Sequence, residues 1–159
     1  MTFIIWARHT KTDTNTRALG GWTSNSTSYY YSYLRVYYTS GQLRPYWNHE
    51  PQTTVATLAM AVDLDSAWHM WCIRETSQTS RSFTLDAGDF GSITNTTNIY
   101  TPWAFQSSCD NFDIGNAQTG DTYDSSWLGD IGPWYIYNRS LSDAEVRQMY
   151  DANKDRFNF

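Results

Sequence analysis

Short runs of aromatic and β-branched residues, separated by polar stretches, follow one another along the chain. Runs of this length and composition are typical of strands, and the stretches between them are rich in turn-forming residues. No helical pattern separates the strands, which favours an antiparallel sandwich or jelly roll over a parallel α/β fold. Strands are expected near 3–8, 17–22, 29–38, 42–48, 53–62, 68–75, 82–87, 103–106, 112–116 and 130–138, with loops at 10–16, 23–28 and 92–98.

One helix is predicted, at the C-terminal end, in the segment LSDAEVRQMYDANKDRF (141–157). Ser142 is its expected N-cap, and Glu145 three residues later completes the capping-box pattern. Leu141, just before the cap, has the spacing of a hydrophobic staple. The apolar positions expected to dock this helix on the sandwich are Val146, Met149 and Tyr150.

Composition and charge narrow the partner classes. The chain has 159 residues, the length of one domain, and 17% of them are aromatic. Its net charge of −5 and the absence of a basic cluster argue against nucleic acid, since binding to phosphates needs a positive surface. No stretch reaches the apolar length of a membrane span, and the start, MTFIIWARHT, lacks the features of a secretion signal.

The two cysteines, Cys72 and Cys109, exclude a disulfide framework and a cysteine-rich metal site. The sequence leaves two outcomes open for them. They form one disulfide, or they are two buried thiols, which is the commoner arrangement.

Three stretches together resemble the concanavalin A-like, laminin-G-like jelly-roll family. Residues 2–22 open with aromatic-x-Ile-x-Trp-x-Arg, and residues 67–76 contain a Trp-His strand. Residues 112–150 contain the motifs Ile-Gly, Gly-x-Ile and Ile-Tyr-Asn-Arg-x-Leu-Ser before the helix. The resemblance implies an all-β, two-sheet antiparallel jelly-roll sandwich with one short C-terminal helix. It implies a single domain over 1–159, in which Trp71 and Ile73 face inward. The tail QMYDANKDRF (148–157) is also similar to tails of such domains in marine bacteriophage particle proteins. That similarity implies a place on a virion surface or outside the cell.

The chain departs from the family at two points. Family members often carry an acidic residue where this chain has Gly132, so no metal role is transferred to that position. The family also usually has one or more strands before the block that begins at Met1, one of them beside 130–138. If this chain lacks them, the edge of 130–138 is left for another subunit or a neighbouring protein to pair with. The alternative is a loop of the same chain that covers the edge.

Catalysis is not expected. Glycosidases of this fold need two carboxylates at close range, whereas the glutamates here are isolated in the sequence. The pair Asp63 and Asp65 projects to one side of an extended segment, at a small separation that suits a retaining mechanism, but it falls at a strand end beside a turn, where solvated carboxylates are ordinary. No Gly-x-Ser-x-Gly elbow occurs, and His69 is expected to be a packed, hydrogen-bonded core residue.

The sequence also suggests the hypothesis that the protein binds a structural calcium ion. Calcium takes six to eight oxygen ligands, and oxygen-bearing side chains are dense between residues 110 and 124. The spacing matches no regular calcium loop, and Asp and Asn are also common turn formers. The candidate ligands are Asp110, Asp113, Asp121 and Asp124, with Asn111 and Asn116 nearby.

The segment YYYSYLRVYY (29–38) has six tyrosines in ten residues. Alternate residues of a strand share a face, and Leu34 with Val36 marks one face as the core side. The other face holds Tyr29, Tyr31, Tyr33, Arg35 and Tyr37. The next strand is expected to pair with it and to add Arg44, Tyr46 and Trp47 to the same surface.

Rings beside arginines and amides suit a protein interface, and they also suit a sugar that stacks on a ring. The preferred hypothesis is a non-catalytic structural or adhesive module of a larger assembly, such as a phage virion decoration or fibre component, with protein partners. The alternative is a lectin-like carbohydrate-binding module.

Overall fold

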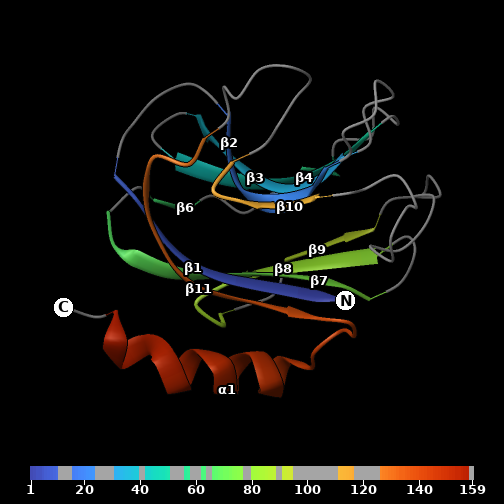
Figure 1. Ribbon diagram of the computed structural model, residues 1–159. Coiled ribbons are helices and arrows are strands. Elements are labelled where there is room, and N and C mark those ends of the chain that lie inside the picture. Colours follow the sequence, from blue (N-terminus) through green and yellow to red (C-terminus); the bar gives the residue numbers. More distant parts are fainter. Residues whose placement is uncertain are drawn as a thin grey trace.

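The computed structural model consists of two facing antiparallel sheets and a helix beneath one of them (Figure 1). It describes residues 1–10, 16–23, 31–39, 42–50, 56–57, 62–63, 66–76, 80–88, 91–94, 111–116 and 126–157. Side chains are described for 1–10, 19–20, 66–76, 80, 82–88, 112–116 and 126–157. The predicted strand at 103–106, Tyr29 and Cys109 lie outside the described residues.

The first sheet has five strands in the order β11–β1–β7–β8–β9. They are β1 (Thr2–His9), β7 (Trp68–Glu75), β8 (Ser80–Leu85), β9 (Gly91–Thr94) and β11 (Gly129–Tyr137). The second sheet has the order β10–β2–β3–β4–β5, and β6 also pairs with β4. Its strands are β2 (Thr16–Thr23), β3 (Tyr31–Thr39), β4 (Gln42–Glu50), β5 (Ala56–Thr57), β6 (Val62–Asp63) and β10 (Asn111–Ile114). The predicted fold class, a two-sheet antiparallel sandwich with one C-terminal helix, is confirmed.

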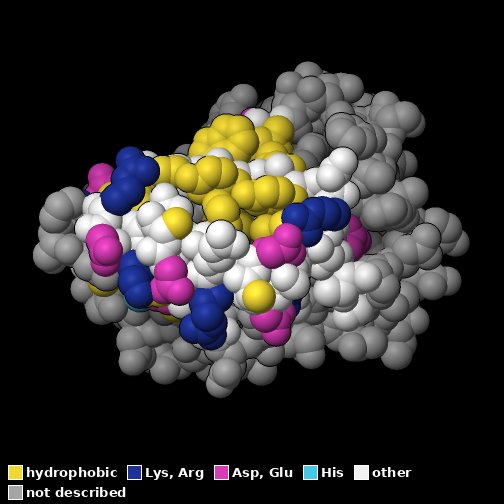
Figure 2. Space-filling model, turned by 90° about the horizontal axis from the view of Figure 1, so that it is seen from below, with side chains coloured by type: hydrophobic (Ala, Val, Ile, Leu, Met, Phe, Trp, Pro, Cys, Tyr) yellow, Lys and Arg dark blue, Asp and Glu magenta, His cyan; other side chains and the backbone are white. Residues whose placement is uncertain are grey.

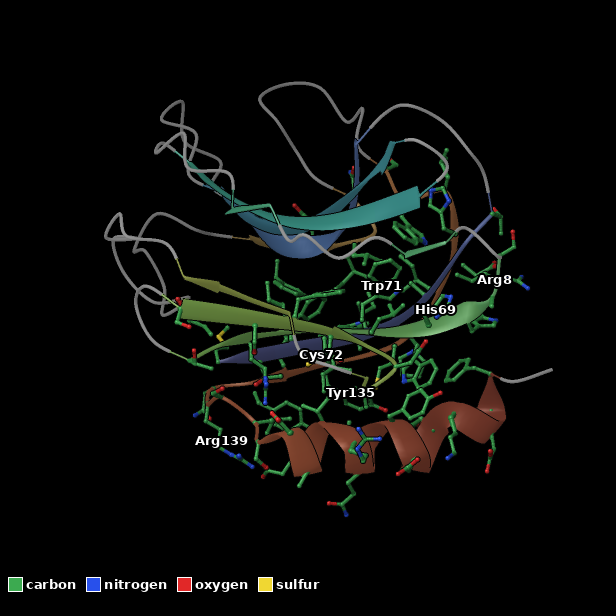
Figure 3. All side chains as sticks on the ribbon, turned by 180° about the vertical axis from the view of Figure 1, so that it is seen from behind. Arg8, His69, Trp71, Cys72, Tyr135 and Arg139 are labelled. Atoms are coloured by element: carbon green, nitrogen blue, oxygen red, sulfur yellow. The ribbon has the colours of Figure 1, made fainter. Side chains whose placement is uncertain are left out.

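Two hydrophobic layers hold these elements together. The layer between the sheets contains Phe3, Ile5, Ala7, Leu19, Trp71, Ile73, Phe83 and Trp127. The layer between the first sheet and the helix contains Ile4, Trp6, Met70, Cys72, Ala87, Leu141 and Val146. Trp71 points toward the second sheet, while Tyr135 lies on the helix side (Figure 3).

The apolar run of β1 follows from these two layers. In a strand with one solvent-exposed face, polar residues alternate with apolar ones, but a strand that is buried on both faces is apolar throughout. Phe3 and Ile5 enter the layer between the sheets, and Ile4 and Trp6 enter the layer under the helix. Each of these four residues is at most 1% exposed.

The helix begins as the sequence predicts. Ser142 is the N-cap of α1 (Asp143–Asn153), its Oγ accepts a hydrogen bond from the Glu145 amide, and its own amide donates to Glu145 Oε2 at 2.7 Å. The helix ends earlier than predicted, and a 3-10 turn, η1 (Lys154–Arg156), continues the chain. Within the described residues, no helix has the length and apolarity needed to cross a membrane.

Several predicted strand and loop boundaries differ from the structure, three of them as follows. The loop predicted at 92–98 is wrong for its first three residues, because they belong to β9 and pair with β8. The strand predicted at 82–87 covers 80–85 instead, since Asp86 and Ala87 have φ of 52° and 54° and turn the chain. The strand predicted at 53–62 is described only as β5 and β6, two short pieces that pair with different parts of β4.

Candidate functional site

Apart from Tyr29, which lies outside the described residues, the residues predicted to contact a ligand lie on β3 and β4, the middle of the second sheet. Cross-strand register aligns Tyr33 with Asn48, Arg35 with Tyr46, and Tyr37 with Arg44. Directly opposite residues of an antiparallel pair share a face. The β3 residues Tyr33, Arg35 and Tyr37 therefore lie on the same surface of the sheet as their β4 partners. Only the backbone of these residues is described, so their role as a site stays a prediction.

The pairing extends this surface into β2 with short residues. Positions opposite the β3 set are Thr16, Ala18, Gly21 and Thr23. We call the resulting alignment the outer rows: Thr16–Tyr37–Arg44, Ala18–Arg35–Tyr46–Thr57, Gly21–Tyr33–Asn48 and Thr23–Tyr31–Glu50. Each row places an aromatic or cationic residue of β3 between a short residue and a polar or aromatic one.

Gly20 shows which surface these rows occupy. A Cβ built on Gly20 stands 3.2 Å from the ring of Phe3, which belongs to the layer between the sheets, and Gly20 pairs with Leu34. The Gly20–Leu34 row is therefore on the core side, as the sequence predicts for Leu34, and the alternating outer rows lie on the opposite surface. Trp47 pairs with Leu34 and so takes a register position next to the outer rows, not in them.

The calcium hypothesis is only partly within the described structure. Asp113 lies on β10, opposite Gly21, while Asp110, Asp121 and Asp124 lie outside the described residues. No group of three or more His, Cys, Asp or Glu side chains suited to a metal occurs within the described part. The hypothesis stays a prediction that a thermal melt with and without EDTA tests.

His69 is hydrogen-bonded, as predicted, but it is only partly buried and is not among the residues of either core layer. Its Nδ1 lies 2.6 Å from Asp86 Oδ2, and its side chain is 17% exposed. The Met70 amide donates to the other oxygen of Asp86 at 2.8 Å. The carboxylate therefore ties the turn after β8 to β7, which gives the His69–Asp86 pair a structural role.

The family resemblance indicated 130–138 as an edge open to pairing, but sequence reasoning missed the hydrophobic residues that are exposed there. β11 pairs with β1 on one side, and no described strand pairs with its other side. Trp134 is 46% exposed and Ile136 is 37% exposed, and among the described residues they are the exposed large hydrophobics. Their i, i+2 spacing on an edge strand was the available signal, because two such residues share a face.

Ion pairs stand at both ends of this strand. Arg8 Nε donates to Asp130 Oδ2 at 2.9 Å at one end, and Arg139 Nη2 donates to Glu145 Oε1 at 2.6 Å at the other. The Arg139 guanidinium and the Ser142 N–H lower the pKa of Glu145 from 4.5 to about 2. Seen from the helix side, hydrophobic side chains gather in one patch with charged side chains at both ends (Figure 2).

Comparisons with known proteins match the fold and no family. No protein-family model matches the chain, and no curated protein matches it. Among solved structures, the Ruminococcus gnavus IT-sialidase CBM40 bound to α2,3-sialyllactose is similar, with a TM-score of 0.72, 13% identity, and coverage of 94% of this chain and 81% of that chain.

Two further structures share the fold. A heptameric SAP-like pentraxin from Limulus polyphemus has a TM-score of 0.62 at 15% identity, over 96% of this chain and 70% of that chain. A Trypanosoma rangeli sialidase has a TM-score of 0.67 at 14% identity, over 98% of this chain and 23% of that chain. This chain has the jelly-roll β-sandwich fold of the CBM40 domain, consistent with a concanavalin A-like sandwich.

Proposed function

We propose that this domain is a carbohydrate-binding module and that the outer rows of the second sheet are its binding surface. The observation that carries the proposal is the β3–β4 register, which aligns Tyr33 with Asn48 and Arg35 with Tyr46 on the surface away from the core. An aromatic ring offers an apolar face for the C–H side of a sugar. Amide and guanidinium groups supply hydrogen bonds to hydroxyl or carboxylate oxygens.

Similarity of fold supports a carbohydrate-binding function but is insufficient to establish it, because proteins of one fold have many functions. The similar R. gnavus domains are carbohydrate-binding modules, solved with α2,3- and α2,6-sialyllactose. Binding without chemistry is the simplest role for such a module. It also agrees with the sequence, which has no paired glutamates of the glycosidase type.

A glycan array with neutral and sialylated oligosaccharides, followed by calorimetry on the best ligand, tests the proposal. We expect Tyr33→Ala and Arg35→Ala to weaken binding at least about tenfold, which corresponds to about 1.4 kcal/mol. Tyr33→Phe keeps the ring and should retain most of the affinity. Arg156→Ala, a change of the same type in η1, should leave it unchanged. The proposal fails if no glycan binds, or if binding is insensitive to both changes in β3.

The sequence-based preference, an assembly module of a virion or an extracellular particle, is the second candidate function. The observation that favours a protein partner is the outer edge of β11, with which no described strand pairs and on which Trp134 and Ile136 are exposed. Stoichiometric co-purification of the chain in a particle would support that role. A monomeric glycan-binding chain that no particle contains would count against it.

A further inference from the structure

We propose that the β11 edge is a self-association surface, on which a second copy of this chain pairs antiparallel through Trp134–Ile136. This surface is on the first sheet and is independent of the outer rows. The inference rests on three features of the described residues: the edge has one regular segment, its hydrophobic residues complement each other across a two-fold axis, and its end charges do the same.

The regular segment is short and well defined. Register between β1 and β11 shifts between Ile5 and Ala7, where Gly132 and Pro133 interrupt the pairing. A bulge and a proline both discourage strand addition, because they remove regular donors from an edge. From Trp134 to Tyr137 the register with β1 is unbroken. A new strand therefore has the C-terminal half of β11 to pair with.

The hydrophobic residues of this half are positioned on one face. Trp134 lies opposite Ile5 and Ile136 lies opposite Phe3, and both partners belong to the layer between the sheets. The Trp134 ring also contacts Phe112 of the second sheet, with centroids 5.8 Å apart. Trp134 and Ile136 thus extend the core outward along the side of the sandwich.

A two-fold axis at Tyr135, perpendicular to the first sheet, makes this surface self-complementary. It sets Trp134 of each copy opposite Ile136 of the other, on the same face. Aromatic and β-branched residues form favourable cross-strand pairs, and Trp is a frequent interface anchor. The two first sheets then join into one continuous sheet, with the exposed hydrophobic residues buried at the junction.

The charges select the same arrangement. Asp130 and Arg139 stand at opposite ends of the strand, with side chains 50% and 57% exposed. Antiparallel pairing about Tyr135 brings Asp130 of one copy beside Arg139 of the other, twice per dimer. Both hydrogen bonds from Arg8 go to Asp130 Oδ2, so Oδ1 faces no Arg8 donor and can accept from Arg139 of the second copy.

Each end of the edge also holds one acidic and one basic residue, Arg8 with Asp130 and Arg139 with Glu145. Neither end attracts a strongly charged partner. A second copy in antiparallel orientation meets both ends with matched charge, and this is the reason to choose it over an unrelated protein.

Sedimentation velocity over a wide concentration range, on the 159-residue chain, measures the association directly. We expect a monomer–dimer equilibrium that Trp134→Lys weakens at least about tenfold, as loss of an interface anchor does. Gln148→Lys, an exposed change on the helix, is the matched control and should leave the equilibrium unchanged. Circular dichroism of each variant verifies its fold.

A charge exchange tests the orientation. Asp130→Arg alone sets two positive charges against each other in the homodimer, and Arg139→Asp alone sets two negative charges against each other. Each should weaken homodimers by about 100-fold, since like charges at an interface cost several kcal/mol. A 1:1 mixture of the two variants restores both opposite-charge contacts and should form heterodimers. Asp155→Arg, the matched control, should behave as the wild type.

A chain that stays monomeric at millimolar concentration overturns the proposal. So does a dimer that Trp134→Lys leaves intact, which would place the interface elsewhere. A dimer that is lost with Trp134→Lys, while the mixture of charge variants stays monomeric, overturns the antiparallel arrangement.

Discussion

Gly132 of β11 lies against the ring of Phe157, the residue that follows the last turn of the chain's helical segment. A Cβ at position 132 stands 3.2 Å from Phe157 Cε1 and 3.2 Å from Trp6 Cβ. Phe157 stacks on Trp6 with ring centroids 4.5 Å apart and an interplanar angle of 19°. The stacked ring takes the space that a larger side chain at 132 needs. This packing explains why residue 132 is glycine here, whereas members of the jelly-roll family that the sequence resembles often have an acidic residue at this position.

Gly132→Asp should destabilise the protein by at least about 2 kcal/mol, because it places an unpaired carboxylate against the Phe157 ring and Trp6 Cβ. Gly132→Ala should change stability by less than about 1 kcal/mol. Its tight contacts are partly offset by the smaller entropy of the unfolded chain. Urea denaturation followed by tryptophan fluorescence measures both changes.

A double-mutant cycle shows whether Phe157 is the reason. Phe157→Ala removes the ring that a side chain at 132 meets, so Gly132→Asp should be less harmful in that background than in the wild type. Equal losses of stability in the two backgrounds would contradict the explanation.

The Glu145 carboxylate should make stability pH-dependent in the acid range. Its pKa is lowered from 4.5 to about 2 by the Arg139 guanidinium and by the hydrogen bonds from Ser142. A lowered folded-state pKa contributes stability that is complete above the unfolded pKa and is lost as pH falls through the folded value. Stability should therefore decline between about pH 4.5 and 2, and Glu145→Gln should flatten that decline. Melting temperatures across this range are the measurement, and an unchanged slope argues against the prediction.

Arg74 should be a strong determinant of stability because it joins β7, β8 and the start of α1. Its guanidinium donates to Ser82 Oγ at 3.0 Å, to the Leu141 carbonyl at 2.8 Å and to Asp143 Oδ1 at 2.6 Å, and the residue is 6% exposed. Arg74→Met should cost roughly 2–4 kcal/mol, since it leaves buried acceptors without their donor.

The matched variant on the other side of this contact is Asp143→Asn. It keeps an oxygen acceptor and loses only a charge that is 74% exposed, so the expected cost is below about 1 kcal/mol. Chemical denaturation of both variants gives the comparison. Equal costs would mean that the ion pair, and not the buried hydrogen bonds, dominates.

The Cys72 thiol should be unreactive in the folded protein. Cys72 is fully buried in the layer under the helix and is a free thiol, and burial raises its pKa to about 12. Thiolate is the reactive form, so a thiol reagent should label it only through unfolding. In a Cys109→Ser background, labelling should be slow in native buffer and fast in urea. Rapid native labelling would show that the layer opens.

The fold was predictable because strand patterns and capping signals are local. The capping box of Ser142 and Glu145 depends on residues three apart, and the predicted β7, 68–75, agrees with the structure at both ends. β9 was missed because its sequence, GSIT, is polar and has no alternation. It is a strand because β8 offers it a hydrogen-bonding edge. The four residues of β9 do not by themselves reveal that pairing partner.

The candidate site was predictable only in part, for the same reason. Tyrosine alternation in β3 predicts a second aromatic surface, but which residues of β4 join it depends on cross-strand register. That register sets Arg44 and Tyr46 in the outer rows and Trp47 opposite Leu34. A shift of one residue moves every position of a strand to the other face, so sequence spacing within β4 is insufficient.

Amino-acid order alone was enough for the fold class and the helix start, since each depends on neighbouring residues or on composition. Sequence-distant contacts decided the rest: Phe157 over Gly132, Arg74 at the start of the helix, and Trp134 exposed on an edge. These relationships arise when distant segments pack together, and side-chain burial then depends on which strand happens to be the last in its sheet.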